Sequence, residues 1–191
     1  MTSSDQTELP EGAQAEVAGR VGLSLEGDLD GRGLRVALAA GRFNGGITLR
    51  LVEGALEGLD ACGVDRADVS VVWVPGAFEL PLVARAFALA ATVDAVVCLG
   101  AVIRGETSHY DFVAGECAAG LQRVQLDTGM PVVFGVLTTE NVEQALARSL
   151  PDSSNKGRES AQTAVEMARL VRSGPLVGSG GPAGRRASAM I

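Results

Sequence analysis

Short apolar runs alternate with longer amphipathic runs through the middle of the chain, and this alternation restricts the available folds more than any other feature. The strand-like runs, rich in valine, leucine and alanine, cover residues 34–39, 69–74, 95–99 and 131–137. Apolar residues at helical spacing follow each of them and predict helices over 47–62, 78–91, 109–126, 139–148 and 155–171. This order favours a parallel sheet with helices on both faces, joined by right-handed crossovers.

The expected fold is a three-layer α/β/α sandwich around a central four-stranded parallel sheet. Hydrophobic residues make up 47% of the 191-residue chain and aromatic residues only 4%, a composition that suits α/β layers. The short run 21–25 is a candidate N-terminal edge strand. We predict one domain over 21–172, a flexible acidic arm over 1–20 and a disordered Gly/Pro-rich tail over 173–191.

Charge and cysteine content exclude several classes of function. The net charge of −7 argues against a broad nucleic-acid-binding surface. One histidine and three cysteines without a CxxC pair argue against a metal site, so Cys62, Cys98 and Cys117 are expected to be buried, reduced thiols. The polar, acidic start does not resemble a signal peptide, and the apolar runs are too short to span a membrane. We therefore expect a cytoplasmic protein.

The loops that follow the predicted strands hold the candidate site residues. Because the carboxyl ends of parallel strands meet at one edge of the sheet, these loops should converge there, where ligands bind in such folds. They contain Phe43, the run Ala77-Phe78-Glu79, the run from Gly105 to His109 and the segment after Leu137. A ligand site is therefore predicted at this edge.

His109 is the only histidine and lies between a β-like run and a helix-like run. An imidazole can give and take a proton near neutral pH, which suits general acid–base catalysis. The glycine-flanked backbone before the helix favours an anion, because its unpaired N–H groups point outward. The alternative is a histidine that only packs at, or caps, the start of the helix.

Other candidates also have structural alternatives. Phe43 could stack on a planar heterocycle or act as a hydrophobic staple for the next helix. Glu79 could accept bonds from sugar-like hydroxyls or simply favour a helix N-terminus. Thr107 could contact an anion or cap the helix, as could Ser108. Arg148 could clamp a phosphate or only end a helix, and Lys156 could form a solvated ion pair with Glu159.

Several motifs taken together resemble the 6,7-dimethyl-8-ribityllumazine synthase family over about 22–170. The matching runs are Arg42-Phe43-Asn44, Val74 to Pro81, Gly100 to Asp111, Pro131 to Asn141, Gln144 to Arg148, and Asn155-Lys156-Gly157 with Glu159. The resemblance implies a flavodoxin-like fold and a transferase without metal or organic cofactor. The implied reaction condenses 5-amino-6-(D-ribitylamino)uracil with 3,4-dihydroxy-2-butanone 4-phosphate, releasing phosphate and water.

The resemblance also assigns roles to residues. His109 would shuttle protons, and Glu106, Thr107 and Arg148 would meet the phosphate. The remaining assigned residues would bind the pyrimidine substrate: Phe43, Ala77, Phe78, Glu79, Ala101, Val102, Ile103, Phe134 and Lys156. Phe134 would reach the site from a neighbouring subunit.

The resemblance implies a homo-pentamer, with a sixty-chain icosahedral shell and a riboflavin synthase partner as further expectations. The competing interpretation is a non-catalytic flavin-binding or shell-forming protein on the same fold. Phe43, Glu79, His109 and Arg148 are all retained, which favours the enzyme.

Overall fold

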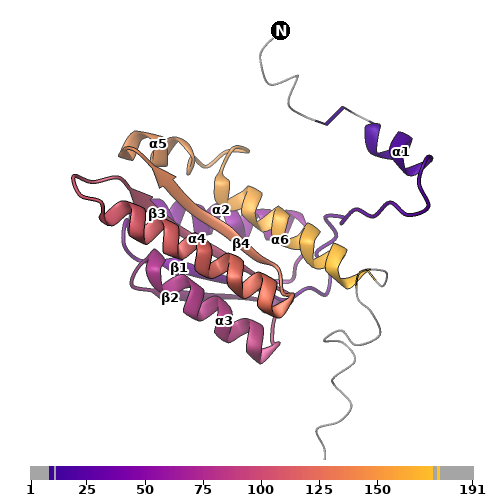
Figure 1. Cartoon of the computed structure of the whole chain (residues 1–191), viewed down its shortest axis with the longest axis horizontal. Coiled ribbons are helices and arrows are strands. Elements are labelled where there is room, and N and C mark those ends of the chain that lie inside the picture. The colour runs from indigo at the N-terminus through magenta and orange to yellow at the C-terminus, as the bar shows by residue number, and fades with distance from the viewer. Residues whose placement is uncertain (1–8, 11, 174–175, 177–191) are drawn as a thin grey trace, which may run out of the picture.

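The computed structural model describes residues 9–10, 12–173 and 176, and within them the chain builds one parallel sheet (Figure 1). Its strands are β1 (Val36–Gly41), β2 (Val69–Val74), β3 (Ala95–Ile103) and β4 (Val132–Thr139). The strand order is β2-β1-β3-β4, and every neighbouring pair is parallel. This order matches the doubly wound arrangement, in which ligands bind where the order of strand addition reverses, here between β1 and β3.

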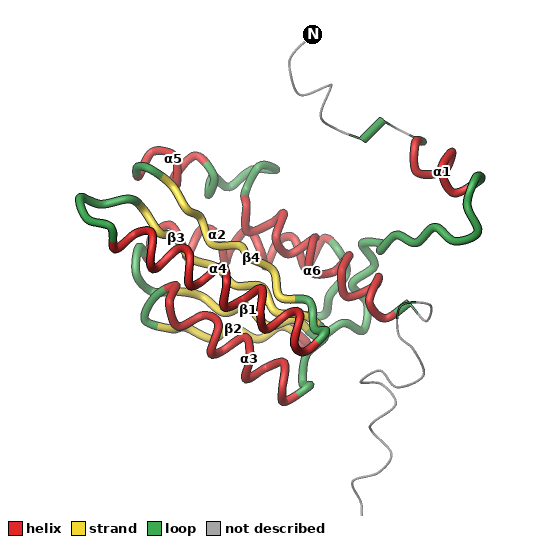
Figure 2. Tube along the Cα trace, in the orientation of Figure 1, coloured by secondary structure: helices red, strands yellow, loops and turns green. Residues whose placement is uncertain are grey.

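Helices cover both faces of the sheet, as the tube in Figure 2 shows. On one face lie α2 (Gly45–Ala61) and α6 (Lys156–Arg172), and on the other lie α3 (Leu80–Ala90) and α4 (His109–Thr128). The short helix α5 (Val142–Ala147) follows β4, and two 3-10 turns, η2 (Arg66–Asp68) and η3 (Ala77–Glu79), flank β2. The predicted three-layer α/β/α sandwich is confirmed.

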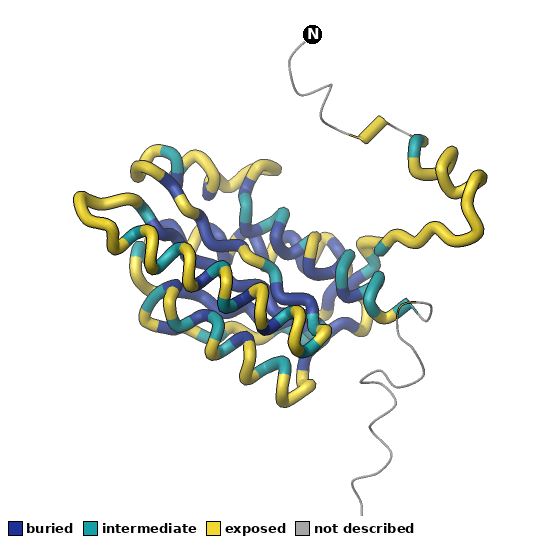
Figure 3. The backbone as a smooth tube through the Cα atoms, viewed as in Figure 1, coloured by how far each residue is buried: buried dark blue, intermediate teal, exposed yellow. Residues whose placement is uncertain are grey.

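Both central strands are buried on both faces, which explains their unbroken apolar sequence (Figure 3). Successive side chains point to opposite faces. Leu38 and Ala40 therefore pack with α2 and α6, whereas Ala37 and Ala39 pack with α3 and α4. The sheet is thus the middle layer between two hydrophobic cores.

The three cysteines are free and buried, as predicted. Burial raises the pKa of Cys117 to about 12 and that of Cys98 well above its ordinary value. Both groups are therefore protonated, apolar-packing thiols.

Helices α2 and α6 pack closely because Gly157 lies against the backbone of α2. A Cβ atom at Gly157 would overlap the carbonyl oxygen of Leu51. The buried Asn155 closes the same contact: its Oδ1 accepts from Gly157 N at 2.8 Å, and its Nδ2 donates to Leu150 O at 2.9 Å. Asn155 thus caps α6 and fixes where that helix begins.

The predicted edge strand over 21–25 is wrong for the chain as described. Val21 and Leu23 are exposed, and the segment runs away from the sheet toward the short helix α1 (Ala13–Ala18). A strand needs a neighbouring edge for its backbone hydrogen bonds, and the described residues provide none here.

The arm also contains a helix, α1, that its sequence pattern does not predict, because α1 has no buried residue to create an apolar face. The arm's first eight residues and residue 11 lie outside the described part. So do positions 174–175 and 177–191 of the predicted tail. Among the described residues, no helix combines the length and apolar character needed to cross a bilayer.

Candidate functional site

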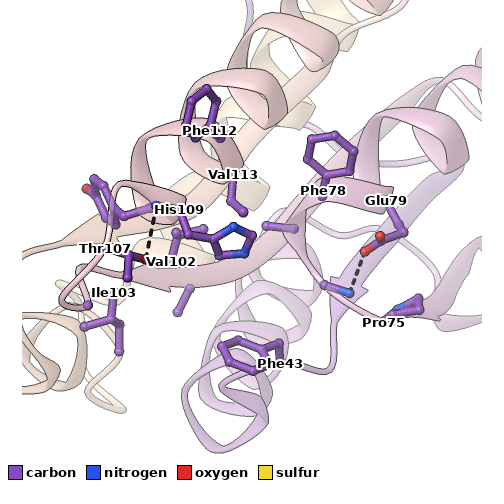
Figure 4. Close-up of a pocket in the computed structure, with 15 residues that line it drawn as sticks. Phe43, Pro75, Phe78, Glu79, Val102, Ile103, Thr107, His109, Phe112 and Val113 are labelled. Atoms are coloured by element: carbon purple, nitrogen blue, oxygen red, sulfur yellow. Dashed lines mark hydrogen bonds between the residues drawn. The ribbon is translucent and has the colours of Figure 1, made fainter.

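A cavity of about 620 Å³ opens at the carboxyl edge of the sheet (Figure 4). It lies where the loops after β1, β2 and β3 converge, as predicted from the sequence. The segment after Leu137, which was expected to join them, does not line this cavity. The predicted site residues that line it are Phe43, Ala77, Phe78, Glu79, Ala101, Val102, Ile103, Thr107 and His109.

The unequal lengths of β1 and β3 create the opening. The pairing between these strands ends at Ala40 and Leu99, whereas β3 continues to Ile103 along β4. Beyond Leu99, the edge of β3 that faces β1 therefore has no strand beside it. Ala101 O on this edge accepts from Asn44 Nδ2 at 2.9 Å. The end of β3 thus presents backbone polar groups to the cavity.

Phe43 stands at the mouth of the cavity on the loop after β1. That loop is fixed to the loop after β2, because Arg42 N donates to Val74 O at 2.8 Å and Phe43 N to Pro75 O at 3.0 Å. The Phe43 residue is 73% exposed. A hydrophobic staple would be buried, so that alternative is wrong, and the ring is free to stack on a ligand.

Glu79 follows β2 in the turn η3 and has a structural role. Its Oε2 accepts from Gly76 N at 2.9 Å and closes the turn. This bond uses one carboxylate oxygen and holds the side chain at the cavity wall, beside Phe78 (Figure 4). Oε1 retains its capacity to accept from a ligand hydroxyl.

His109 begins α4, and its imidazole projects toward the middle of the cavity (Figure 4). Its backbone N–H makes only a long bond of 3.4 Å to Thr107 Oγ1, and the Ser108 side chain caps nothing. The expected capping role of these hydroxyls is therefore weak. Within the described chain, no backbone N–H from Gly105 to Ser108 donates a hydrogen bond. This loop and the helix start can therefore receive an anion.

Four predicted residues do not line this cavity. Glu106 is exposed on the loop before α4. Phe134, Arg148 and Lys156 line a second cavity of about 450 Å³, beside β4 and the start of α6. Arg148 is the C-cap residue of α5, and its Nη1 donates to Gln144 O at 3.0 Å. Within one chain, these three side chains do not share the cavity of His109.

Lys156 also forms the expected ion pair with Glu159, at 2.6 Å between Nζ and Oε2. Both side chains are about half exposed, so the pair contributes little to stability. It does hold the ammonium group beside the second cavity.

Several lining residues were not predicted, namely Pro75, Gly76, Tyr110, Phe112 and Val113. Helical spacing could have found Phe112, because a residue three positions after His109 shares its face of α4. Within the described ranges, no cluster of three or more histidine, cysteine or acidic side chains is arranged to hold a metal.

The family comparison agrees with this geometry. Residues 33–172 match the model of the 6,7-dimethyl-8-ribityllumazine synthase family, which spans the whole sheet and all its covering helices. The chain belongs to this family. It is therefore a transferase of riboflavin biosynthesis, a lumazine synthase, and the cavity at the carboxyl edge is its candidate active site.

Proposed function

We propose that the chain condenses 5-amino-6-(D-ribitylamino)uracil with 3,4-dihydroxy-2-butanone 4-phosphate to form 6,7-dimethyl-8-ribityllumazine, in the cavity that contains His109. The observation that carries the proposal is the composition of this cavity. An exposed aromatic ring, an unpaired strand edge, an imidazole and a loop of free N–H groups line one space. These groups match a flat heterocycle, a proton-transfer reaction and a phosphate.

The pyrimidine ring would stack on Phe43, and its polar edge would meet the backbone of Ala101, Val102 and Ile103. Ala77 and Phe78 would complete the apolar wall, and Glu79 would accept from the ribityl chain. Because Asn44 already occupies Ala101 O, recognition at this edge would rely on the remaining backbone groups, those of Ile103 among them.

The phosphate would bind the N–H groups of Gly105 to Ser108, with Thr107 donating from its hydroxyl. Glu106 is an anion, so only its backbone could serve the phosphate. The Glu106 side chain must point to solvent.

The reaction needs orientation and proton transfer rather than a strong nucleophile. The aromatic amine attacks the ketone and water leaves as the imine forms. Phosphate is then eliminated, and the ribityl-bearing nitrogen closes the second ring with loss of water. His109 lies where it could carry protons between these steps. Holding the two substrates side by side supplies much of the acceleration.

We further propose that the second cavity completes the site of a neighbouring subunit. Phe134, Arg148 and Lys156 gather there, away from His109. In a ring of subunits, a neighbour's Phe134 would cover the pyrimidine, and its Arg148 would neutralise the phosphate with Lys156 nearby. A pentamer, a sixty-chain shell, a riboflavin synthase partner and a cytoplasmic location are the predictions that accompany this arrangement. Sedimentation distinguishes the two assemblies, and a lone pentamer peak at all concentrations rules out the shell.

The decisive experiment mixes the purified protein with both substrates and follows lumazine fluorescence and phosphate release together. We expect both signals to rise in step, and neither to rise with one substrate alone. Absence of both signals, combined with tight flavin binding, would identify a non-catalytic flavin-binding module instead.

A further inference from the structure

Arg104 is a charged residue directly after β3 that contacts no substrate in the proposed reaction. Its Nε donates to Glu140 Oε2 at 2.8 Å, and its Nη1 donates to Asp111 Oδ1 at 3.1 Å. The guanidinium carbon also lies 4.0 Å from the centroid of the Tyr110 ring. One side chain therefore bridges two carboxylates and stacks on an aromatic ring.

The partners of Arg104 belong to different elements. Tyr110 and Asp111 lie in the first turn of α4, directly after His109, whereas Glu140 follows β4. Glu140 is itself anchored, because its backbone N–H donates to Gln144 Oε1 at 2.9 Å. Arg104 thus links the start of α4 to a fixed point beside β4.

The loop between Arg104 and α4 has few bonds of its own. Arg104 N donates to Thr139 O at 2.9 Å, which is the last hydrogen bond between the β3 and β4 segments. From Gly105 to Ser108, however, the backbone N–H groups have no partner within the described chain. The Arg104 side chain therefore spans this loop and joins the first turn of α4 to the residue after β4. Asp111 and Glu140 are more than half exposed, so each ion pair alone contributes little. Their combination on one guanidinium, with the stacked Tyr110 ring, forms a network that the isolated Lys156–Glu159 pair lacks. Groups that are ordered before binding lose less entropy when the ligand arrives.

We propose that Arg104 is a positioning residue that holds the Gly105–Ser108 loop and the first turn of α4 in the geometry that binds the phosphate group of the substrate. The proposal rests on the proposed function, since the phosphate is the ligand assigned to this loop. Arg104 acts through the loop and the helix, because its donors point to Glu140 and Asp111 and not into the cavity.

Charge and geometry can be separated with two variants. Arg104→Lys keeps the positive charge but loses the planar fork that reaches both carboxylates. Arg104→Gln loses both and leaves Asp111 and Glu140 without their cation. We expect KM for the phosphorylated substrate and Kd for inorganic phosphate to rise about fivefold in the Lys variant, the equivalent of one hydrogen bond, and further in the Gln variant. KM for the aminouracil substrate should stay unchanged.

Arg169→Gln is the matched control. Arg169 also bridges two carboxylates, those of Asp28 and Asp30, and it is partly buried far from the cavity. Its loss should lower stability but leave both KM values and the phosphate Kd unchanged. If Arg104→Gln fails to fold, Arg104→Lys and Glu140→Gln carry the test, since each removes only part of the bridge.

Wild-type phosphate affinity in Arg104→Lys and Glu140→Gln would overturn the proposal, and so would an equal rise of both KM values. A wild-type protein that binds no inorganic phosphate would also overturn it. The titration with inorganic phosphate needs no turnover. A protein without synthase activity that still binds phosphate through Arg104 would therefore refute the proposed reaction and leave the positioning role standing.

Discussion

Asn44 donates from Nδ2 to the carbonyl oxygen of Ala101 over 2.9 Å, across 57 positions of sequence. This bond joins the loop that carries Phe43 to the open end of β3. Asn44 also adopts a left-handed conformation, with φ 57° and ψ 37°. Asparagine tolerates this region better than most residues. The one residue therefore both adopts the turn conformation after β1 and makes the hydrogen bond to β3.

Two substitutions at Asn44 separate these contributions. Asn44→Gly removes the bond but suits the positive φ, and should cost about 1 kcal/mol of unfolding free energy. Asn44→Ala should cost about 1 kcal/mol more, because a Cβ is strained in this conformation. Urea denaturation measures both values. Equal stability of the two variants would contradict the assigned strain.

The proton-shuttle role of His109 predicts a loss of turnover without a loss of fold. His109→Ala should lower the single-turnover rate by about 10²-fold, with residual activity because both substrates are still oriented. Rapid-mixing measurements of lumazine formation at saturating substrate check this. A rate equal to that of the wild type would remove His109 from the proton transfers.

The division of the site between two cavities predicts complementation. A mixed assembly of His109→Ala and Arg148→Ala chains contains sites with an intact His109 from one subunit and an intact Arg148 from its neighbour. Refolding the two impaired variants together should therefore give more activity than either variant has alone.

The control mixture combines His109→Ala with Phe43→Ala, since both residues line the same cavity. Every site in that mixture has a damaged first cavity, so no activity should return. Failure of the first mixture, with mixed oligomers demonstrated, would mean that Arg148 does not act across an interface.

Asp30 predicts a pH-dependent part of the stability. Hydrogen bonds from the Arg32 side chain and backbone, together with the charges of Arg32 and Arg169, hold the pKa of this carboxyl well below its ordinary value. A carboxylate with a lowered folded-state pKa stabilises the protein above its unfolded pKa, and the stabilisation is lost as the pH falls.

We therefore expect the stability difference between the wild type and Asp30→Asn to be largest above about pH 4 and to shrink at lower pH. Urea midpoints measured from pH 7 to pH 2 test this. Asp127→Asn is the control, because Asp127 accepts no hydrogen bond in the described structure. A gap for Asp30→Asn that does not change with pH would contradict the assigned cause.

The sequence predicts the three α/β/α layers and most residues of the cavity that contains His109. A parallel strand buried on both faces must be apolar throughout, so runs such as 95–99 identify the sheet. Because the carboxyl ends of parallel strands meet at one edge of the sheet, the strand positions alone then bring Phe43, Glu79 and His109 together.

Other features depend on contacts that no local pattern encodes. The bond from Asn44 to Ala101 exists only because β3 extends past β1. The separation of Arg148 from the Gly105 loop follows from the position of α5 beyond β4. Residues 21–25 have the alternation of a strand, but alternation does not supply the neighbouring edge that a strand requires.

Gly157 has no side chain, yet it determines where the neighbouring Lys156 lies in the second cavity. A single methyl group there would wedge α6 away from Leu51, and Lys156, the preceding residue, would shift with the helix. If neighbouring subunits share their sites, that wedge would damage an active site in a different chain. Position 157 therefore has almost no mutational tolerance, even though it contributes no functional group of its own.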